Sequence, residues 1–200
     1  MIPSALAETP RKRERSSEDP ESALIEAARG GDPAAFTRIY RLHATTAFAR
    51  LTRLLGPIAE REDLLQKVFL ELHRALRTFR GDASLGTFVR RITAHVALGY
   101  LRSWRRRPAV PLEPEHLASM IAPGLPPDEA ARARQDLRQL LDLLDRLRPK
   151  KRLAFVLVAV EGLSCAEAGI ELGASADAVK QRVLAARREL KAMLARKEAR

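Results

Sequence analysis

The stretch EDLLQKVFLELHRALRTFRGDASLGTFVRRITAHVALGYLRSWRRR, residues 62–107, decides the fold class of this chain. Its first part carries apolar residues at helical spacing, namely Leu65, Val68, Phe69, Leu72, Leu76 and Phe79. After the turn Arg80-Gly81-Asp82, the same spacing returns at Leu85, Phe88, Val89, Ile92 and Val96. Because this spacing lines one side of an α-helix with apolar side chains, the stretch predicts two amphipathic helices joined by a short turn.

The cationic residues of the same stretch lie off the apolar stripe or follow it: Arg90, Arg91, Arg102, Arg105, Arg106 and Arg107. A buried face beside a cationic face that also carries aromatic residues suits the binding of nucleic acid. The charge of the whole chain supports this interpretation, since a net charge of +11 favours a polyanionic partner. The alternative is a basic surface that simply faces water.

The composition predicts a globular protein of one or two small domains, with 46% hydrophobic and 30% charged residues in a chain of 200. Cys165 is the single cysteine, which excludes an intrachain disulfide and suits a reducing compartment. No apolar run approaches the roughly 20 residues of a membrane span, and charges stand where a signal peptide would have its apolar core. We therefore expect the protein in the cytoplasm.

The sequence lacks the motifs of catalysis and metal binding. It contains no phosphate-binding glycine loop and no Ser/His/Asp signature. Its histidines are scattered without the spacing of a metal site, at His43, His73, His95 and His116. We expect no enzyme, no metal and no cofactor.

The first half of the chain is predicted to contain four helices behind a disordered tail at residues 1–20. Asp32-Pro33 is a strong helix start, because aspartate caps the first turn and proline fits its first position. Gly56-Pro57 breaks the helix that follows. The expected helices cover residues 22–28, 33–55, 58–79 and 84–106.

A linker is predicted at residues 108–128, which contain Pro108, Pro111, Pro114, Pro123, Pro126 and Pro127. Such a segment is semi-extended, and it would let two helical units engage sites that lie apart on one partner. Beyond it, leucines at helical spacing run from Leu137 to Leu147. Residues 153–162 (LAFVLVAVEG) are apolar on all sides, so we expect them to form the central helix of a small bundle.

Residues 164–190 predict a helix-turn-helix. Ser164 and Glu167 have the spacing of a capping box, Gly173 supplies a sharp turn, and Ser175 can cap the next helix. The buried face of that second helix should consist of Val179, Val183, Ala186 and Leu190. Its polar side could face the major groove and the phosphates of DNA with Lys180, Gln181, Arg182, Arg187 and Arg188. The alternative is an ordinary helical hairpin with a solvated charged face.

The predicted fold class is all-α, because no alternating strand pattern occurs. Two small helical domains are expected at residues 21–107 and 129–200, joined by the linker at 108–128.

In this order, the two halves resemble an extracytoplasmic-function (ECF) sigma factor of the sigma-70 family, over residues 23–194. AARGGDPAAFTRIYRLH (27–43) resembles the opening helices of that family, residues 63–107 its polymerase-binding and minus-10 segment, and residues 147–190 its minus-35 domain. The resemblance implies a transcription initiation factor that binds core RNA polymerase and directs it to specific promoters, reading duplex minus-35 and melted minus-10 DNA. It also implies an anti-sigma factor as a partner.

The resemblance assigns roles to residues of each segment. The helix that docks on core polymerase is matched by Asp63, Leu64, Gln66, Lys67, Phe69 and Leu70. The minus-10 element, whose flipped base needs a pocket and a stacking surface, is assigned to Arg80, Phe88, Arg91, His95, Tyr100, Arg102, Trp104, Arg105 and Arg106. The minus-35 element is assigned to Lys180, Gln181, Arg182, Arg187 and Arg188. Tyr100 and Trp104 could instead close the end of the helical bundle, and His95 is expected at the surface.

Several positions differ from the usual pattern of the family. Lys67 stands where Glu is usual, His73 and Phe88 where Trp is usual, His95 where Asn is usual, and Gly99 where Asp is usual. In the second half the departures are Ala168-Gly169 in place of Ile-Ala, and Ala178, Gln181 and Ala185 in the recognition helix. They predict a divergent member with an unusual promoter preference, or a sigma-like protein that has lost promoter melting.

Two other functions stay open. A stand-alone helix-turn-helix regulator would need no polymerase, but it would have no use for a docking helix at residues 63–79. A sigma-like adaptor would bind polymerase or another partner without opening promoters. The departures at Lys67, His95 and Gly99 are compatible with that adaptor.

Overall fold

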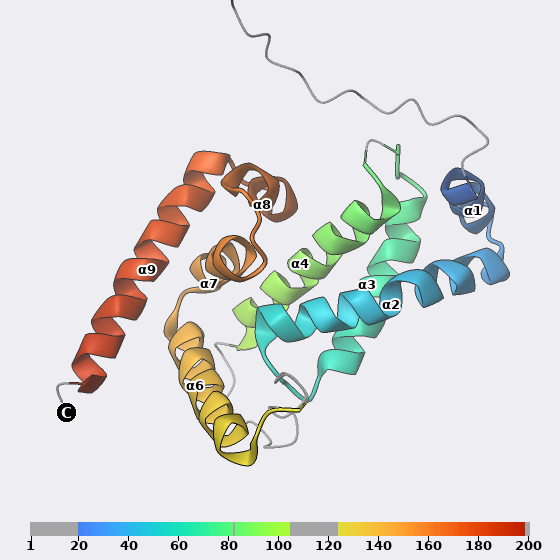
Figure 1. The fold of residues 1–200 in the computed structure, drawn as a ribbon. Coiled ribbons are helices and arrows are strands. Elements are labelled where there is room, and N and C mark those ends of the chain that lie inside the picture. Colours follow the sequence, from blue (N-terminus) through green and yellow to red (C-terminus); the bar gives the residue numbers. More distant parts are fainter. Residues whose placement is uncertain (1–19, 82, 105–123, 199–200) are drawn as a thin grey trace, which may run out of the picture.

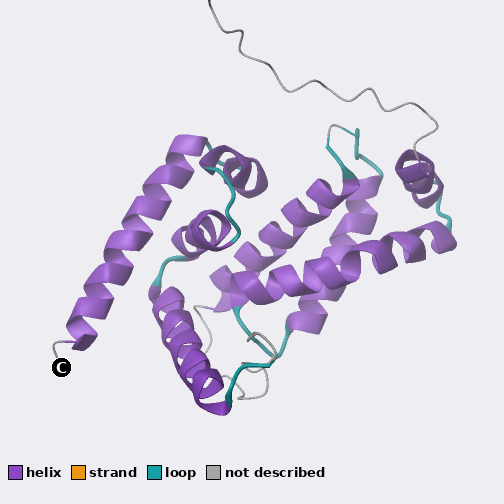
Figure 2. Cartoon of the chain, in the orientation of Figure 1, coloured by secondary structure: helices purple, strands orange, loops and turns teal. Residues whose placement is uncertain are grey.

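The structure is a computed structural model that describes residues 20–81, 83–104 and 124–198 (Figures 1 and 2). Every regular element in this part of the chain is a helix, as the sequence predicts. The elements are α1 (Pro20–Arg29), α2 (Pro33–Leu55), α3 (Arg61–Leu76), α4 (Leu85–Trp104), α6 (Pro127–Arg146), α7 (Pro149–Phe155), the π-helix η1 (Val156–Val160), α8 (Cys165–Leu172) and α9 (Ala176–Glu198). The expected tail, apart from Pro20, and most of the expected linker lie outside the described residues.

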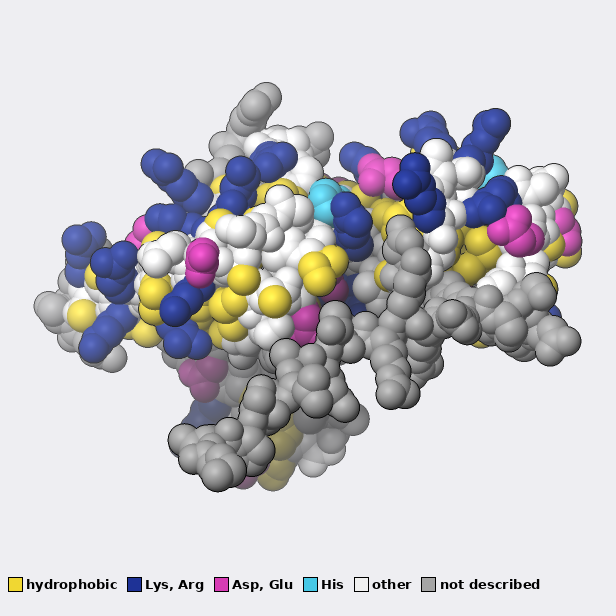
Figure 3. Space-filling view, turned by 90° about the horizontal axis from the view of Figure 1, so that it is seen from above, with side chains coloured by type: hydrophobic (Ala, Val, Ile, Leu, Met, Phe, Trp, Pro, Cys, Tyr) yellow, Lys and Arg dark blue, Asp and Glu magenta, His cyan; other side chains and the backbone are white. Residues whose placement is uncertain are grey.

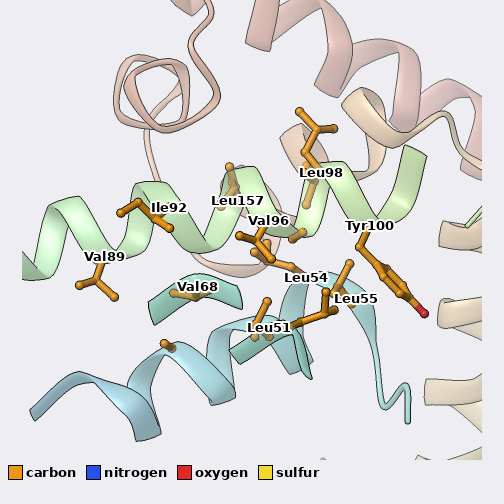
Figure 4. Packing of buried hydrophobic residues seen from close by; sticks show 14 of the residues in the cluster. Leu51, Leu54, Leu55, Val68, Val89, Ile92, Val96, Leu98, Tyr100 and Leu157 are labelled. Atoms are coloured by element: carbon orange, nitrogen blue, oxygen red, sulfur yellow. The ribbon is translucent and has the colours of Figure 1, made fainter. Parts of the chain in front are cut away.

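The first half consists of α1 to α4, and the ends of α2 follow the signals in the sequence. Asp32 caps α2 by accepting a hydrogen bond from the Ala34 amide at 2.8 Å, with Pro33 in the first turn. Gly56 ends α2 with a φ of 85°, a conformation that favours glycine. Helices α2, α3 and α4 pack against one another around a core rich in leucine and valine (Figure 4).

Helix α3 is shorter than the helix predicted at residues 58–79. It begins at Arg61 and ends at Leu76, after which the Thr78 and Phe79 amides donate to carbonyls three residues back. Ile58 and Phe79 are nevertheless only 9% and 8% exposed. The apolar pattern is longer than the helix because turn residues at both of its ends also pack into the core.

The second half differs from the prediction at residues 153–162. The helix there begins at Pro149, but it changes to a π-helix over Val156–Val160 and gives way to a turn at Gly162. Leu153 and Leu157 are fully buried, whereas Val160 is 53% exposed. The segment is therefore not buried on all sides, since the π turn ends it at the surface.

The two halves share one hydrophobic core. Helix α4 contacts α7 and α8, and Leu157 of η1 belongs to the same buried cluster as Leu54 of α2 (Figure 4). Arg152 of α7 is 1% exposed and donates to the carbonyls of Leu54 at 3.3 Å and Leu55 at 2.7 Å. Because the last carbonyls of a helix have no partner within it, this arginine caps α2 from the other half of the chain.

Ion pairs also join the halves beside the end of α2. Arg50 is 2% exposed and binds two carboxylates, Glu161 at 2.7 Å and Glu171. Arg53 pairs with Glu161, and Arg90 pairs with Glu171. The partners of Arg50 lie 111 and 121 residues away in the sequence, so no local pattern could have predicted them.

Candidate nucleic-acid and polymerase interfaces

The exposed face of α4 is cationic, and the helix contains no acidic residue. Arg91, His95 and Arg102 are exposed, and so is Arg80 in the preceding turn. His95 Nδ1 lies 2.8 Å from the carbonyl oxygen of Arg91. Because a carbonyl can only accept, Nδ1 carries the proton of the neutral ring, and Nε2 is left as an acceptor.

The aromatic residues predicted to stack on bases do not share this exposed face. Tyr100 is 9% exposed, and its hydroxyl donates to Glu60 at 3.1 Å. Phe88 is half-buried and packs against Phe79 with the ring centroids 4.6 Å apart. The stacking role expected for Tyr100 is therefore corrected, because its ring lies in the core. The predictions for the side chains of Trp104, Arg105 and Arg106 lie outside the described residues.

Helix α3 has one surface face, which we call the docking face, formed by Asp63, Gln66, Lys67 and Leu70. Leu70 is 51% exposed and gives this face an apolar part. Leu64 and Phe69 are only 8% and 4% exposed, and the Phe69 ring packs against Tyr40. Of the residues matched to the docking helix, these two therefore face the core, and for Phe69 this is the side that the apolar stripe predicts.

The helix-turn-helix forms at the residues that the sequence indicates. Ser164 and Glu167 make a reciprocal capping box at the start of α8, and Gly173 ends α8 with a left-handed φ of 59°. The Ser175 hydroxyl caps α9 by accepting from the Ala178 amide at 3.2 Å. Helix α9 packs on α7 and α8, and its buried residues are the expected Val179, Val183, Ala186 and Leu190.

The outer side of α9 carries the polar residues predicted for minus-35 DNA. Lys180, Gln181, Arg187 and Arg188 are exposed, and Arg182 is half-buried. Residues seven apart share a side of a helix, so Lys180 lies with Arg187, and Gln181 lies with Arg188. Figure 3 shows Lys and Arg side chains across the whole face that it presents, with Asp and Glu side chains scattered among them.

Two family models match the chain in the order of its halves: sigma-70 region 2 over residues 39–107 and sigma-70 region 4 over residues 137–190. The ECF RNA polymerase sigma factor SigM of Mycobacterium tuberculosis (strain H37Rv) is 33% identical over 175 residues, which cover 87% of this chain and 84% of SigM. The chain belongs to the ECF family of RNA polymerase sigma factors. It is a transcription initiation factor that directs RNA polymerase to specific promoters.

Further relatives of this sigma factor agree over most of its length. The RNA polymerase sigma factor NccH of Alcaligenes xylosoxydans xylosoxydans is 32% identical, covering 87% of this chain and 94% of NccH. The solved structure of CnrH in complex with the cytosolic domain of CnrY matches with a TM-score of 0.57 and 27% identity. That match covers 87% of this chain and 96% of the other, so it includes both halves.

The described part of this sigma factor contains no group of His, Cys, Asp or Glu side chains that could hold a metal ion. Within the same residues, no helix is long and apolar enough to cross a membrane. Burial lowers the pKa of His43, although Glu21 acts in the opposite direction. Hydrogen bonds from Ser164 lower the pKa of Glu167. The Glu167 shift follows from the helix cap of α8 and the His43 shift from burial, so neither indicates a catalytic group.

Sequence reasoning missed the role of Gly169 in this sigma factor. A Cβ at Gly169 would lie 2.6 Å from the Ala174 carbonyl oxygen, so only glycine lets the turn after α8 approach so closely. The signal was present, since Ala168-Gly169 departs from the family pattern. The pattern alone, however, does not show which atom the missing side chain makes room for.

Proposed function

We propose that this sigma factor divides promoter recognition between two halves, residues 21–107 and 129–200. The docking face of α3 binds core RNA polymerase. The exposed side of α4 holds minus-10 DNA, and the outer side of α9 recognises the minus-35 duplex. The observation that carries this division is the pair of exposed basic helix faces, one in each half of the chain.

On α4, Arg91, His95 and Arg102 are exposed and have access to DNA. Arginine binds phosphate whatever the base sequence, and His95 Nε2 can accept a hydrogen bond from a base. Phe79 and Phe88 lie on either side of the turn Arg80-Gly81-Asp82 in the sequence, and their rings pack together. They therefore provide a packed surface beside the position that a flipped base would occupy. Arg80 is exposed in that turn, and the basic run continues in the sequence through Trp104, Arg105 and Arg106.

On α9, Lys180 and Gln181 lie near the helix start, the part of a recognition helix that enters the major groove. Lysine pairs with guanine edges and glutamine with adenine edges. Arg187 and Arg188 lie two turns further along and bind phosphates, and Arg182 adds charge beside them. The division into base-reading and phosphate-binding residues follows from these positions on the helix.

A protein regulator is the further partner that we propose. CnrH was solved in complex with the cytosolic domain of CnrY, and the family implies an anti-sigma factor. A single cysteine and a polymerase partner agree with a cytoplasmic protein. The chemistry of transcription belongs to the polymerase, so we assign no catalytic residue to this chain.

The adaptor function keeps one specific observation in its favour. Lys67 is exposed within the docking face, where the family usually carries a carboxylate. Run-off transcription with purified core polymerase, the full chain and a pool of genomic fragments separates the possibilities. We expect promoter-dependent transcripts. An adaptor would bind core polymerase without giving transcripts, and a stand-alone regulator would bind DNA without core polymerase.

Single substitutions test the two interfaces separately. Leu70→Asp should weaken binding to core polymerase, because it places a charge in the apolar part of the docking face. Arg187→Ala should weaken promoter binding. It should also reduce the salt slope, which is the slope of the logarithm of the binding constant against the logarithm of salt concentration, by about one. Arg196→Ala, exposed in the last turn of the same helix, is the matched control. Unchanged affinity and slope in Arg187→Ala would remove α9 from the proposed interface.

A further inference from the structure

Gly99 lies in the middle of α4, and no described atom requires a glycine at this position. A Cβ built on Gly99 meets nothing within 4 Å, and its φ is not in the positive range. Glycine inside a helix is unfavourable relative to alanine, because it loses more backbone freedom on folding. The folded chain itself therefore gains nothing from this glycine.

Other glycines in the described part of the chain have a structural reason. Gly169 avoids a clash with the Ala174 carbonyl oxygen. Gly30 and Gly86 stand at helix ends, where the helical constraint is weakest. Positive φ values explain Gly31, Gly56, Gly81, Gly124, Gly162 and Gly173. Gly99 differs from all of these, since it stands within a helix and faces open space.

The surroundings of Gly99 indicate what approaches it. His95 lies one turn before it and Arg102 one turn after it, and all three positions are exposed. Helix α4 contains no carboxylate, and from Leu85 to Ser103, where the structure describes its side chains, none of its residues is among the exposed large hydrophobic ones. We call the bare backbone at Gly99, between the side chains of His95 and Arg102, the α4 notch. An apolar protein surface would find no exposed apolar side chain at the notch, whereas a polyanion would find Arg91 on one side of it and Arg102 on the other.

We propose that the sugar–phosphate backbone of promoter DNA crosses α4 at Gly99, in direct contact with the helix backbone. This inference rests on the proposed DNA-binding role of α4 and adds the path of the strand. Glycine permits the closest approach of a protein backbone to a ligand. Arg91 and Arg102, about 16 Å apart along the helix axis, bind phosphates on either side. The ring of His95, held by its bond to the Arg91 carbonyl, forms one wall of the notch.

The test adds volume to the notch without changing charge. Gly99→Ala and Gly99→Leu are assembled with core polymerase and measured on a promoter fragment selected by run-off transcription. Both variants should melt at or above the temperature of the parent chain. Promoter affinity should fall, on the order of tenfold for Gly99→Leu, as expected for overpacking a close contact. The salt slope should stay unchanged, because no phosphate-binding charge is lost.

Two DNA probes identify the form of the strand. One carries a single-stranded minus-10 region, and the other is fully duplex there. A loss confined to the first probe places the melted strand in the notch, and an equal loss on both places duplex DNA there. Arg102→Ala is the electrostatic comparison, since it should reduce the salt slope by about one. Thr37→Ala, which raises helix propensity at an exposed position of α2, controls for stabilisation alone.

Three outcomes would overturn the inference. Gly99→Leu binding promoter DNA as tightly as the parent would show that the notch is empty in the complex. Gly99→Leu losing affinity for core polymerase instead of DNA would place a protein contact at the notch. A parent holoenzyme that selects no promoter would overturn the proposed function and this inference together. The first two outcomes leave the proposed function standing.

Discussion

At the scale of single residues, Arg152 shows how a charged side chain becomes part of the core. In the sequence it ends the run Pro149-Lys150-Lys151-Arg152, whose last three residues are all cationic. In the structure it is 1% exposed, donates to two carbonyls at the end of α2 and pairs with Asp145. Its charge therefore stabilises a helix end that has no partner of its own.

Arg152→Ala should lower the free energy of unfolding by about 3 kcal/mol, because it leaves buried carbonyls unsatisfied and opens a void. Equilibrium unfolding in urea measures this change. Lys150→Ala is the control, since Lys150 is exposed and lies in the same turn. Equal stability of the Arg152→Ala variant and the parent would show that the cap across the two halves contributes nothing.

At the scale of elements, the helix-turn-helix is the part that the sequence predicts best. Its capping box, its glycine turn and the cap of α9 each involve residues no more than four apart. The bounds of α3 and the π-helix at Val156–Val160 were not predicted. Both depend on how turn residues and neighbouring helices pack, and apolar periodicity cannot distinguish a buried turn from a buried helix.

The capping box makes a pH-dependent prediction. The Ser164 hydroxyl and amide donate to the Glu167 carboxylate at 2.7 and 2.8 Å and lower its pKa. A lowered pKa in the folded state adds stability above the unfolded pKa, and this stability is lost as pH falls through the folded pKa. Ser164→Ala should raise the pKa of Glu167, as measured by NMR titration of the side-chain carboxyl.

The stability difference between Ser164→Ala and the parent should be largest near neutral pH and shrink under acid conditions, where Glu167 is protonated in both proteins. Carboxylates remote from α8 serve as internal references in the same titration. A difference in stability that grows on acidification would contradict this account.

Gly169→Ala should destabilise the helix-turn-helix by about 1–3 kcal/mol, because the new methyl group meets the Ala174 backbone carbonyl. Urea unfolding measures the change. The same substitution at Gly99 is the matched control, since the methyl group there meets no atom. It should increase stability by about 0.5–1 kcal/mol. If both substitutions changed stability in the same direction, packing would not explain why position 169 holds a glycine.

At the scale of the whole molecule, the two halves are joined by a shared core and by the ion pairs of Arg50. The proposed function requires the two halves to lie farther apart on promoter DNA than they do in this fold. The minus-35 and minus-10 promoter elements are centred about 25 base pairs apart, which corresponds to roughly 85 Å at 3.4 Å per base pair. A compact fold of about 180 residues has a radius of gyration near 16 Å, and hence a diameter of only about 40 Å.

The distance between the halves should therefore increase when holoenzyme binds promoter DNA. Fluorescent labels at Thr37→Cys and Lys191→Cys, in a Cys165→Ser background, report this distance by energy transfer, since both labelled positions are exposed. Transfer should fall on promoter binding. A pair within the second half, Gln135→Cys and Lys191→Cys, should stay unchanged. Constant transfer between the halves would mean that they contact the promoter without separating.

The sequence by itself determined the helical fold class, the helix caps, the helix-turn-helix and the basic residues of α4 and α9. These features depend on residues within one or two helical turns of each other, so local spacing is enough to reveal them. Only the tertiary structure decided that Leu64 and Tyr100 face the core, and that Arg50 and Arg152 join the halves. Those outcomes depend on contacts between helices far apart in the sequence, and such contacts exist only once the helices have packed.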